Sequence, residues 1–265
     1  MDTLWKYSVS GVWGPQAILE ESDSYGGPHC AYKDDNSVVF RVAVALVLLP
    51  LWVWEVRRAQ PIFDKEFEQR LQSLQKANKI QPSALEKMMA VACSLCMLYN
   101  IYFKIESRTL IFLLNPCHFA TVLLIYLGFT PFSKTNERVA LASFGFFFGG
   151  WLGIIFRENE GMSQFYCLMY DIQHVFLAFG GAIVFSLSGK YDLRKWYTPK
   201  VILMGAACFS AYNRLVLMPI SLMTWANLNH SLCGLHSDPA YELLNLGKWY
   251  WLVSEIYLTM AQFVG

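Results

Sequence analysis

Reactive and charged side chains interrupt three of the long apolar stretches in this sequence. Such groups are costly inside a bilayer, so their presence is by default a sign of function. The three stretches and their polar residues are 109–129 with Asn115-Pro116-Cys117-His118, 165–187 with Asp171, Gln173 and His174, and 201–223 with Asn213-Arg214.

Cys117 and His174 have the residue types of a nucleophile and its base. A thiol becomes a strong nucleophile when a neighbouring base takes its proton. At about 1.5 Å per helical residue, Cys117 lies about 12 Å and His174 roughly 14 Å from the same membrane face, with Arg214 at a comparable depth. The spacing therefore predicts that the thiol and the imidazole meet inside the membrane.

Other residues are candidates for supporting roles. Asp171 precedes His174 by three residues and is predicted to orient the imidazole from a neighbouring part of the same helical face. His118 is a poorer partner for Cys117, because adjacent helical residues diverge by about 100° around the axis. The predicted oxyanion donors are Asn115, Asn213 and Arg214. The predicted ligands for a phospholipid phosphate at the membrane face are Lys104 and Arg108.

A purely structural reading competes with this one. Buried cysteines in membrane helices usually pack as small hydrophobic residues, and buried histidines usually bond to a neighbouring helix. Cys93 and Cys96 lie on an apolar stretch without accompanying ligands, so we expect them in the core rather than in a zinc site. Pro116 cannot donate to the carbonyl of Phe112, and we expect a kink that leaves this carbonyl free.

The elements that must position these residues are membrane-spanning helices. Of 265 residues, 55% are hydrophobic and only 15% are charged, whereas soluble domains have about 25% charged residues. A span needs about 20 mostly apolar residues. We expect an all-α fold, a multi-pass transmembrane bundle of about seven spans forming one domain over 1–265. The spans are 38–56, 85–103, 109–129, 139–156, 165–187, 201–223 and 249–264.

Three local patterns mark helix positions between the spans. Ser83 and Glu86 form a capping box before the second span. Thr198-Pro199 opens the sixth span, with proline at the first helical position. In the loop 57–84, apolar residues recur at helical spacing and predict a helix on the membrane surface, with a solvated linker as the alternative. These residues are Phe63, Phe67, Leu71 and Leu74.

Orientation follows from the basic residues, because cytoplasmic loops carry more of them. Thirteen lie on one side: Arg57, Arg58, Lys65, Arg70, Lys76, Lys79, Lys87, Lys134, Arg138, Lys190, Arg194, Lys195 and Lys200. Six lie on the other: Lys6, Lys33, Lys104, Arg108, Arg157 and Lys248. We therefore expect a lumenal tail over 1–37, a cytoplasmic loop over 57–84 and a cytoplasmic C-terminus. The net charge of +1 gives no argument for nucleic-acid binding.

This topology places Cys30 and Cys233 in the same lumenal compartment, where disulfides persist. A bridge between them would tie the N-terminal tail to the last lumenal loop, and two separate thiols are the alternative. Asn229-His230-Ser231 matches a glycosylation acceptor within a few residues of the membrane.

The same residues resemble a known family, the transmembrane protein 164 family, whose members are regarded as cysteine-dependent phospholipid acyltransferases. The matching pieces follow one another along nearly the whole chain. They are Gly26-Gly27-Pro28 with Cys30-Ala31, Phe103-Lys104, Leu113-Leu114-Asn115-Pro116-Cys117-His118, Ile172-Gln173-His174-Val175, and Asn227-Leu228-Asn229 with Leu232-Cys233 and Ser237-Asp238-Pro239.

We expect a location in the endoplasmic reticulum or another endomembrane and no cofactor or metal, and the resemblance implies an enzyme. Its substrates would be a diacyl phospholipid and an ether-linked lysophospholipid, with a polyunsaturated acyl chain transferred between them. The family's active cysteine maps onto Cys117 and its essential histidine onto His174. Asp171 and Asn213-Arg214 depart from the family, so their roles rest on this sequence alone.

Two other functional classes fit parts of the sequence. A small transporter or channel would explain the mid-membrane charges of Asp171 and Arg214, and its transport would survive loss of the thiol. A seven-span receptor would explain the topology, but the Asn-Pro-x-x-Tyr pattern usual in the last span is absent, and Asn115-Pro116 falls in the third.

Overall fold

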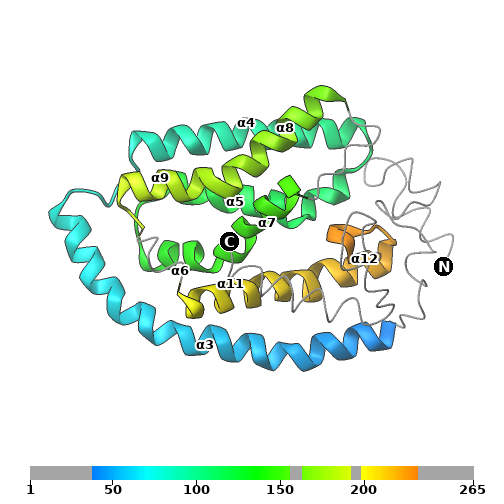
Figure 1. Ribbon diagram of the computed structural model, residues 1–265, viewed down its shortest axis with the longest axis horizontal. Coiled ribbons are helices and arrows are strands. Elements are labelled where there is room, and N and C mark those ends of the chain that lie inside the picture. Colours follow the sequence, from blue (N-terminus) through cyan, green and yellow to red (C-terminus); the bar gives the residue numbers. More distant parts are fainter. Residues whose placement is uncertain (1–37, 156–162, 192–197, 232–265) are drawn as a thin grey trace. The chain divides into compact units, whose positions relative to one another are not determined.

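The computed structural model describes residues 38–155, 163–191 and 198–231. Every regular element in these ranges is a helix (Figure 1), as the sequence predicts. Four helical segments are long and apolar enough to cross a membrane: Ala84–Glu106, Lys134–Ile155, Gln164–Ser188 and Pro199–Thr224. The chain is therefore a multi-pass integral membrane protein.

These four segments coincide with the second, fourth, fifth and sixth predicted spans. The first predicted span lies inside one longer helix, and the third is divided into two shorter ones. The seventh, 249–264, lies outside the described residues.

The helices have the following bounds: α3 Val38–Lys76, α4 Ala84–Glu106, η3 Leu110–Leu114, α5 Pro116–Phe129, α6 Lys134–Ala142, α7 Phe144–Ile155, α8 Gln164–Val175, η4 Phe176–Gly180, α9 Gly181–Ser188, α11 Pro199–Tyr212, η5 Asn213–Leu217, α12 Met218–Thr224 and η6 Leu228–His230. The elements η3 and η6 are 3-10 helices. The elements η4 and η5 are π-helical turns.

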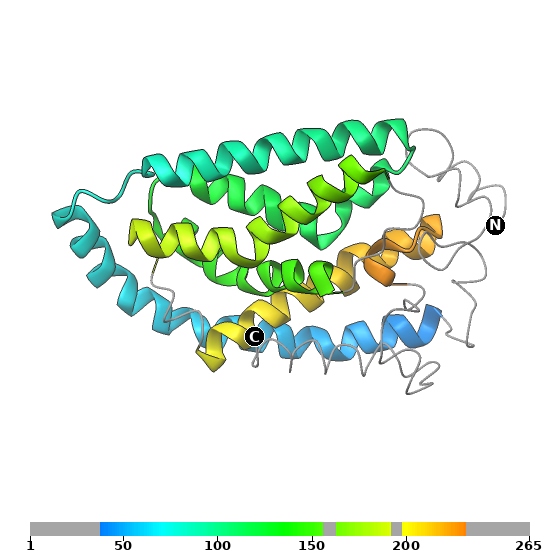
Figure 2. The same ribbon diagram turned by 45° about the horizontal axis from the view of Figure 1, so that its top comes forward.

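The helix predicted over 57–84 exists, but it is not a separate element. It continues the first predicted span without interruption as α3, which reaches Lys76 (Figure 2). Its apolar face is buried at Phe67 and Leu74, and the Phe67 ring stacks on Phe132 at 5.6 Å. The expectation that this face rests on the membrane surface is therefore wrong at these two positions, because protein side chains cover it.

Both predicted helix starts are confirmed. The Glu86 N–H donates to Ser83 Oγ at 3.2 Å, and the Ser83 N–H donates to Glu86 Oε2 at 2.7 Å. These are the two reciprocal bonds of a capping box. Helix α11 begins at Pro199, where the missing N–H costs nothing.

The chain divides into two compact units. Of the described residues, unit 1 contains 38–50, Asn100–Pro116 and 210–231, and unit 2 contains Leu51–Tyr99 together with 117–155, 163–191 and 198–209. In unit 2, Cys93 and Cys96 are buried, which confirms them as core residues.

Unit 2 also contains a buried ion pair. Lys190 Nζ lies 3.4 Å from Glu86 Oε1, and both side chains are only 1% exposed. The same ammonium donates to the carbonyls of Leu127 at 3.3 Å and Thr130 at 2.6 Å. Burial lowers the pKa of Lys190, and the Glu86 carboxylate opposes this shift. The pair joins α4, the C-terminal end of α5 and the turn that follows α9.

Replacing Glu86 with Gln should destabilise the protein, because it leaves the Lys190 ammonium buried without its counter-charge. Breaking a buried pair by removing one partner costs about 3–5 kcal/mol. Gln keeps an acceptor for the Ser83 N–H, so the capping box survives. The readout is the midpoint of thermal unfolding in detergent.

Ser83→Ala is the matched control for Glu86→Gln. It removes only the cap and should cost about 1 kcal/mol. The double variant Glu86→Gln/Lys190→Met should recover much of the lost stability. Equal stabilities of Glu86→Gln and Ser83→Ala would show that the ion pair contributes nothing beyond the cap.

Candidate functional site

The helix that carries Cys117 starts one residue before it. The 3-10 turn η3 ends at Leu114, Asn115 has φ −57° and ψ 145°, and α5 begins at Pro116. A residue before proline is driven out of the helical region, and proline suits the first position of a helix. The predicted single kinked helix over 109–129 is therefore two helices separated by Asn115.

The prediction that the carbonyl of Phe112 is left free is wrong. This carbonyl accepts the N–H of Asn115 at 3.1 Å, because the 3-10 turn brings this donor one residue earlier than an α-helix would. At the same break between η3 and α5, the hydroxyl of Tyr212 donates to the carbonyl of Leu114 at 2.7 Å. Both bonds lie within unit 1.

As a result, Cys117 lies in the first turn of α5 and is partly exposed. The unpaired amides and the dipole at a helix N-terminus stabilise negative charge. The Cys117 carbonyl accepts the hydroxyl of Thr121 at 2.8 Å. The position thus suits a thiolate better than the middle of a helix would.

Helix α8 contacts this first turn through Gln173, which is 1% exposed. Gln173 Nε2 lies 2.7 Å from Thr121 Oγ1, 3.0 Å from His118 Nδ1 and 3.4 Å from the Cys117 carbonyl. The contact therefore joins the Cys117 backbone to Gln173, which directly precedes His174 in the chain. A direct bond between the Cys117 thiol and His174 stays a prediction.

His174 is 2% exposed, and its ring has a defined orientation. Its Nδ1 lies 2.8 Å from the carbonyl of Tyr170, and the Tyr170 ring stacks on it at 3.9 Å. Because a carbonyl can only accept, Nδ1 carries the hydrogen and the neutral ring keeps its lone pair on Nε2. Nε2 is thus the acceptor atom of the neutral ring, on the side of the ring that faces Gly153 of α7.

The sequence reasoning missed Tyr170 and Gly153 as parts of this site. A Cβ atom on Gly153 of α7 would overlap the His174 ring at Cδ2 and Nε2, and the Tyr170 hydroxyl donates to the Gly153 carbonyl at 3.1 Å. The repeated glycines of α7 are the only signal that a side chain approaches this helix closely. The hydrogen bond that orients the His174 ring goes to the Tyr170 carbonyl. The orienting role of Asp171 stays a prediction.

In unit 1, two of the predicted oxyanion donors belong to one network. The Asn229 N–H donates to Asn115 Oδ1 at 3.0 Å, and Asn229 Nδ2 donates to Asn213 Oδ1 at 2.8 Å. These bonds hold Asn229 in the left-handed region, with φ 46°. Because these bonds use the side-chain oxygens, the side-chain N–H groups of Asn115 and Asn213 are the ones that would serve in the predicted oxyanion roles, which stay predictions.

The same network affects the glycosylation motif. The Asn229 amide is committed to Asn213, and Ser231 is 6% exposed with its hydroxyl bonded to Ser221 at 2.7 Å. An acceptor whose amide is partly buried and hydrogen-bonded, followed by a buried Ser231, is not presented as a surface loop would present it. The structure therefore gives Asn229 a packing role.

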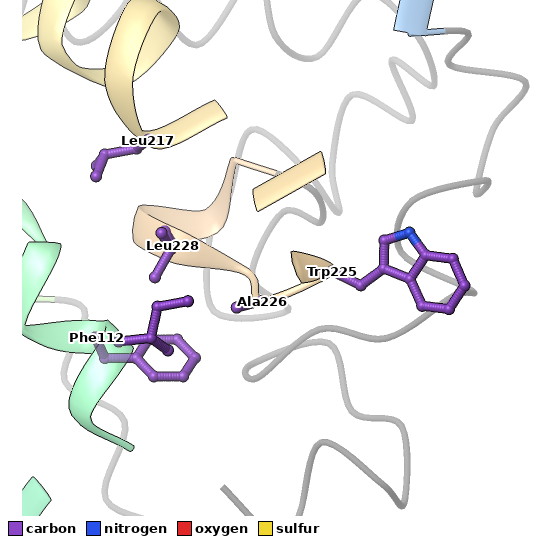
Figure 3. Close-up of a cluster of buried hydrophobic side chains, with 6 residues drawn as sticks. Phe112, Leu217, Trp225, Ala226 and Leu228 are labelled. Atoms are coloured by element: carbon purple, nitrogen blue, oxygen red, sulfur yellow. The ribbon is translucent and has the colours of Figure 1, made fainter. Parts of the chain in front are cut away.

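A hydrophobic cluster packs beside the break. Phe112 faces Ala226 and Leu228 in Figure 3, and the full cluster is Ile111, Phe112, Leu217, Trp225, Ala226 and Leu228. The Lys104 ammonium lies 5.8 Å from the centre of the Phe112 ring, and this lysine is buried. Of the two predicted phosphate ligands, only Arg108 is exposed.

Both π-helical turns adjoin predicted site residues. One, η4, begins two residues after His174, and the other, η5, contains Asn213 and the buried Arg214. Single π turns inside α-helices are frequent at functional sites. Nothing in the sequence pattern indicated them.

Gly153→Ala should remove the space that the His174 ring occupies and so impair any reaction that uses this base. Gly149→Ala is the matched control on the same helix, because a Cβ there meets nothing within 4 Å. We expect Gly153→Ala to lose activity at least about tenfold, since a misplaced catalytic group costs up to about 100-fold. Lipid-transfer assays of both purified variants provide the measurement. Equal activities of the two variants would show that the space beside Gly153 is not needed for the position of the His174 ring.

The predicted disulfide between Cys30 and Cys233 lies outside the described residues. None of the five cysteines within them forms a disulfide. A model of the TMEM164 family matches residues 31–264, a range that includes Cys117 and His174. No solved structure matches the chain.

Proposed function

Because the chain belongs to the TMEM164 family, we propose that it is a membrane-embedded acyltransferase with Cys117 as nucleophile. It would move a polyunsaturated acyl chain from a diacyl phospholipid to an ether-linked lysophospholipid. The observation that carries this proposal is the register of α5 and α8. Gln173 bonds to the first turn of α5 at Cys117 and His118, next to a His174 ring whose Nε2 can accept a proton.

In the first step, His174 Nε2 takes the thiol proton and the Cys117 sulfur attacks the acyl carbonyl carbon of the donor. The C–S bond forms and the ester C–O bond breaks. The leaving oxygen takes this proton from His174. The donor therefore departs as a lysophospholipid with a free hydroxyl group.

In the second step, the free hydroxyl of the ether lysophospholipid gives its proton to His174 and attacks the thioester carbonyl. The new C–O bond forms, the C–S bond breaks, and the sulfur recovers the proton. The two steps exchange one ester for another, so no water, oxidant or cofactor is consumed.

The buried imidazole also supports transfer over hydrolysis. His174 is enclosed by Tyr170 and by the bare backbone of Gly153. Excluding water from a thioester prevents the side reaction that would release a free fatty acid. Lipid substrates reach such a position through the bilayer.

Cys117→Ala should abolish transfer, because no thioester can form. His174→Ala should slow transfer by about 100-fold or more, the usual contribution of a general base. The assay follows an isotope-labelled acyl chain from a diacyl phospholipid to an ether lysophospholipid in proteoliposomes. Mass spectrometry should also find a hydroxylamine-sensitive acyl group on Cys117 in the wild type.

Cys93→Ala and Cys96→Ala are the controls, since both cysteines belong to the core of unit 2. They should retain transfer and so separate chemistry from packing damage. Undiminished transfer by well-folded Cys117→Ala protein would refute the thioester mechanism. Transport through Asp171 and Arg214 would then become the leading hypothesis.

The proposed orientation has the N-terminus in the endoplasmic-reticulum lumen and the C-terminus in the cytosol. Its support is the division of basic residues, thirteen against six. In cells with a permeabilised plasma membrane, protease should cleave a C-terminal tag and spare an N-terminal one. The reverse pattern would place the Cys117 side of the protein toward the cytosol.

A further inference from the structure

Gln173 contacts three groups on the first two turns of α5, and their chemistry defines how its amide is oriented. The Thr121 hydroxyl gives its hydrogen to the Cys117 carbonyl at 2.8 Å. Its oxygen can therefore only accept at the 2.7 Å contact with Gln173. The amide N–H₂ group of Gln173, rather than its oxygen, must face α5.

This orientation determines the hydrogen on His118. The Gln173 nitrogen also lies 3.0 Å from His118 Nδ1 and 3.4 Å from the Cys117 carbonyl, and an amide nitrogen can only donate. His118 Nδ1 must then accept, so the neutral ring carries its hydrogen on Nε2. His118 is 4% exposed, so water does not compete freely for this contact.

The two histidines of unit 2 are thus opposite tautomers, with the hydrogen on Nδ1 in one and on Nε2 in the other. His174 has its hydrogen on Nδ1, fixed by the Tyr170 carbonyl, and accepts at Nε2. His118 accepts at Nδ1, fixed by Gln173, and so carries its hydrogen on Nε2. Acyl transfer requires both kinds of group, a base for the attacking proton and a donor for the developing oxyanion.

We propose that Gln173 is a positioning residue of the acyl-transfer site, which keeps the hydrogen of His118, the residue that follows Cys117 in the chain, on Nε2. The inference rests on the proposed function for the meaning of this donor. The placement of the hydrogen itself follows from the contacts alone. Gln173 also fixes the register between the turn that carries Cys117 and the helix that carries His174.

The direct test is nuclear magnetic resonance of the full-length protein labelled with ¹⁵N-histidine in lipid nanodiscs. Nitrogen shifts distinguish the two neutral tautomers, and His118→Gln and His174→Gln variants assign the signals. The wild type should show His118 protonated on Nε2 and His174 protonated on Nδ1. In Gln173→Glu, the carboxylate can only accept, so the His118 hydrogen should appear on Nδ1 while His174 is unchanged.

The kinetic test measures acyl transfer in the same variants. Gln173→Glu should lower kcat by about 100-fold, as expected for a misdirected oxyanion donor, with little change in KM. A merely structural role would not move the His118 signal without moving that of His174. An unchanged kcat, or His118 protonated on Nδ1 in the wild type, would overturn the proposal.

Thr121 supplies a second pair of variants that does not introduce charge. Thr121→Val removes the acceptor of the first Gln173 N–H and should lower kcat about tenfold, the cost of one weakened hydrogen bond. Thr121→Ser keeps the hydroxyl and should retain wild-type kcat. Equal rates for the two would also overturn the proposal.

The two hypotheses fail in distinguishable ways. If wild-type protein forms no acyl-Cys117, the proposed function fails, but the nitrogen shifts still support or overturn control of the His118 hydrogen by Gln173. If wild-type transfer is normal and Gln173→Glu changes neither shifts nor kcat, only the positioning role fails.

Discussion

A proline without an amide hydrogen determines where the predicted nucleophile lies. Because Pro116 starts a new helix, Cys117 occupies the first turn of α5 instead of the middle of a longer span. Lipid offers no hydrogen-bond partner, so the backbone groups around a break must be bonded within the protein. The bonds of Asn115 to Phe112 and of Tyr212 to Leu114 meet this requirement in unit 1.

The same requirement explains the contact between α5 and α8. A buried amide must match its donors to acceptors, and Gln173 does so with Thr121 and His118. The match fixes two things at once, the register of two helices and the hydrogen on an imidazole. A neutral amide can therefore organise the predicted site without the desolvation penalty of a buried charge.

Features that depend on one helical turn or one apolar run were predictable from the sequence. The capping box at Ser83 and the start of α11 at Pro199 are confirmed, as are the all-α fold and the core position of Cys93 and Cys96. The break at Pro116 was expected as a kink. Its sharper form depends on a 3-10 turn, whose tighter hydrogen bonding the residue pattern does not reveal.

The sequence by itself determined that this chain crosses a membrane as helices and that Cys117 and His174 are its candidate reactive groups. Only the tertiary structure decided what surrounds them. The partners are Tyr170 and Gly153 for His174, and Gln173 for His118. Periodicity shows which residues share a helical face, but not which neighbouring helix covers that face. That choice depends on how each helix is rotated and shifted when all the side chains pack together.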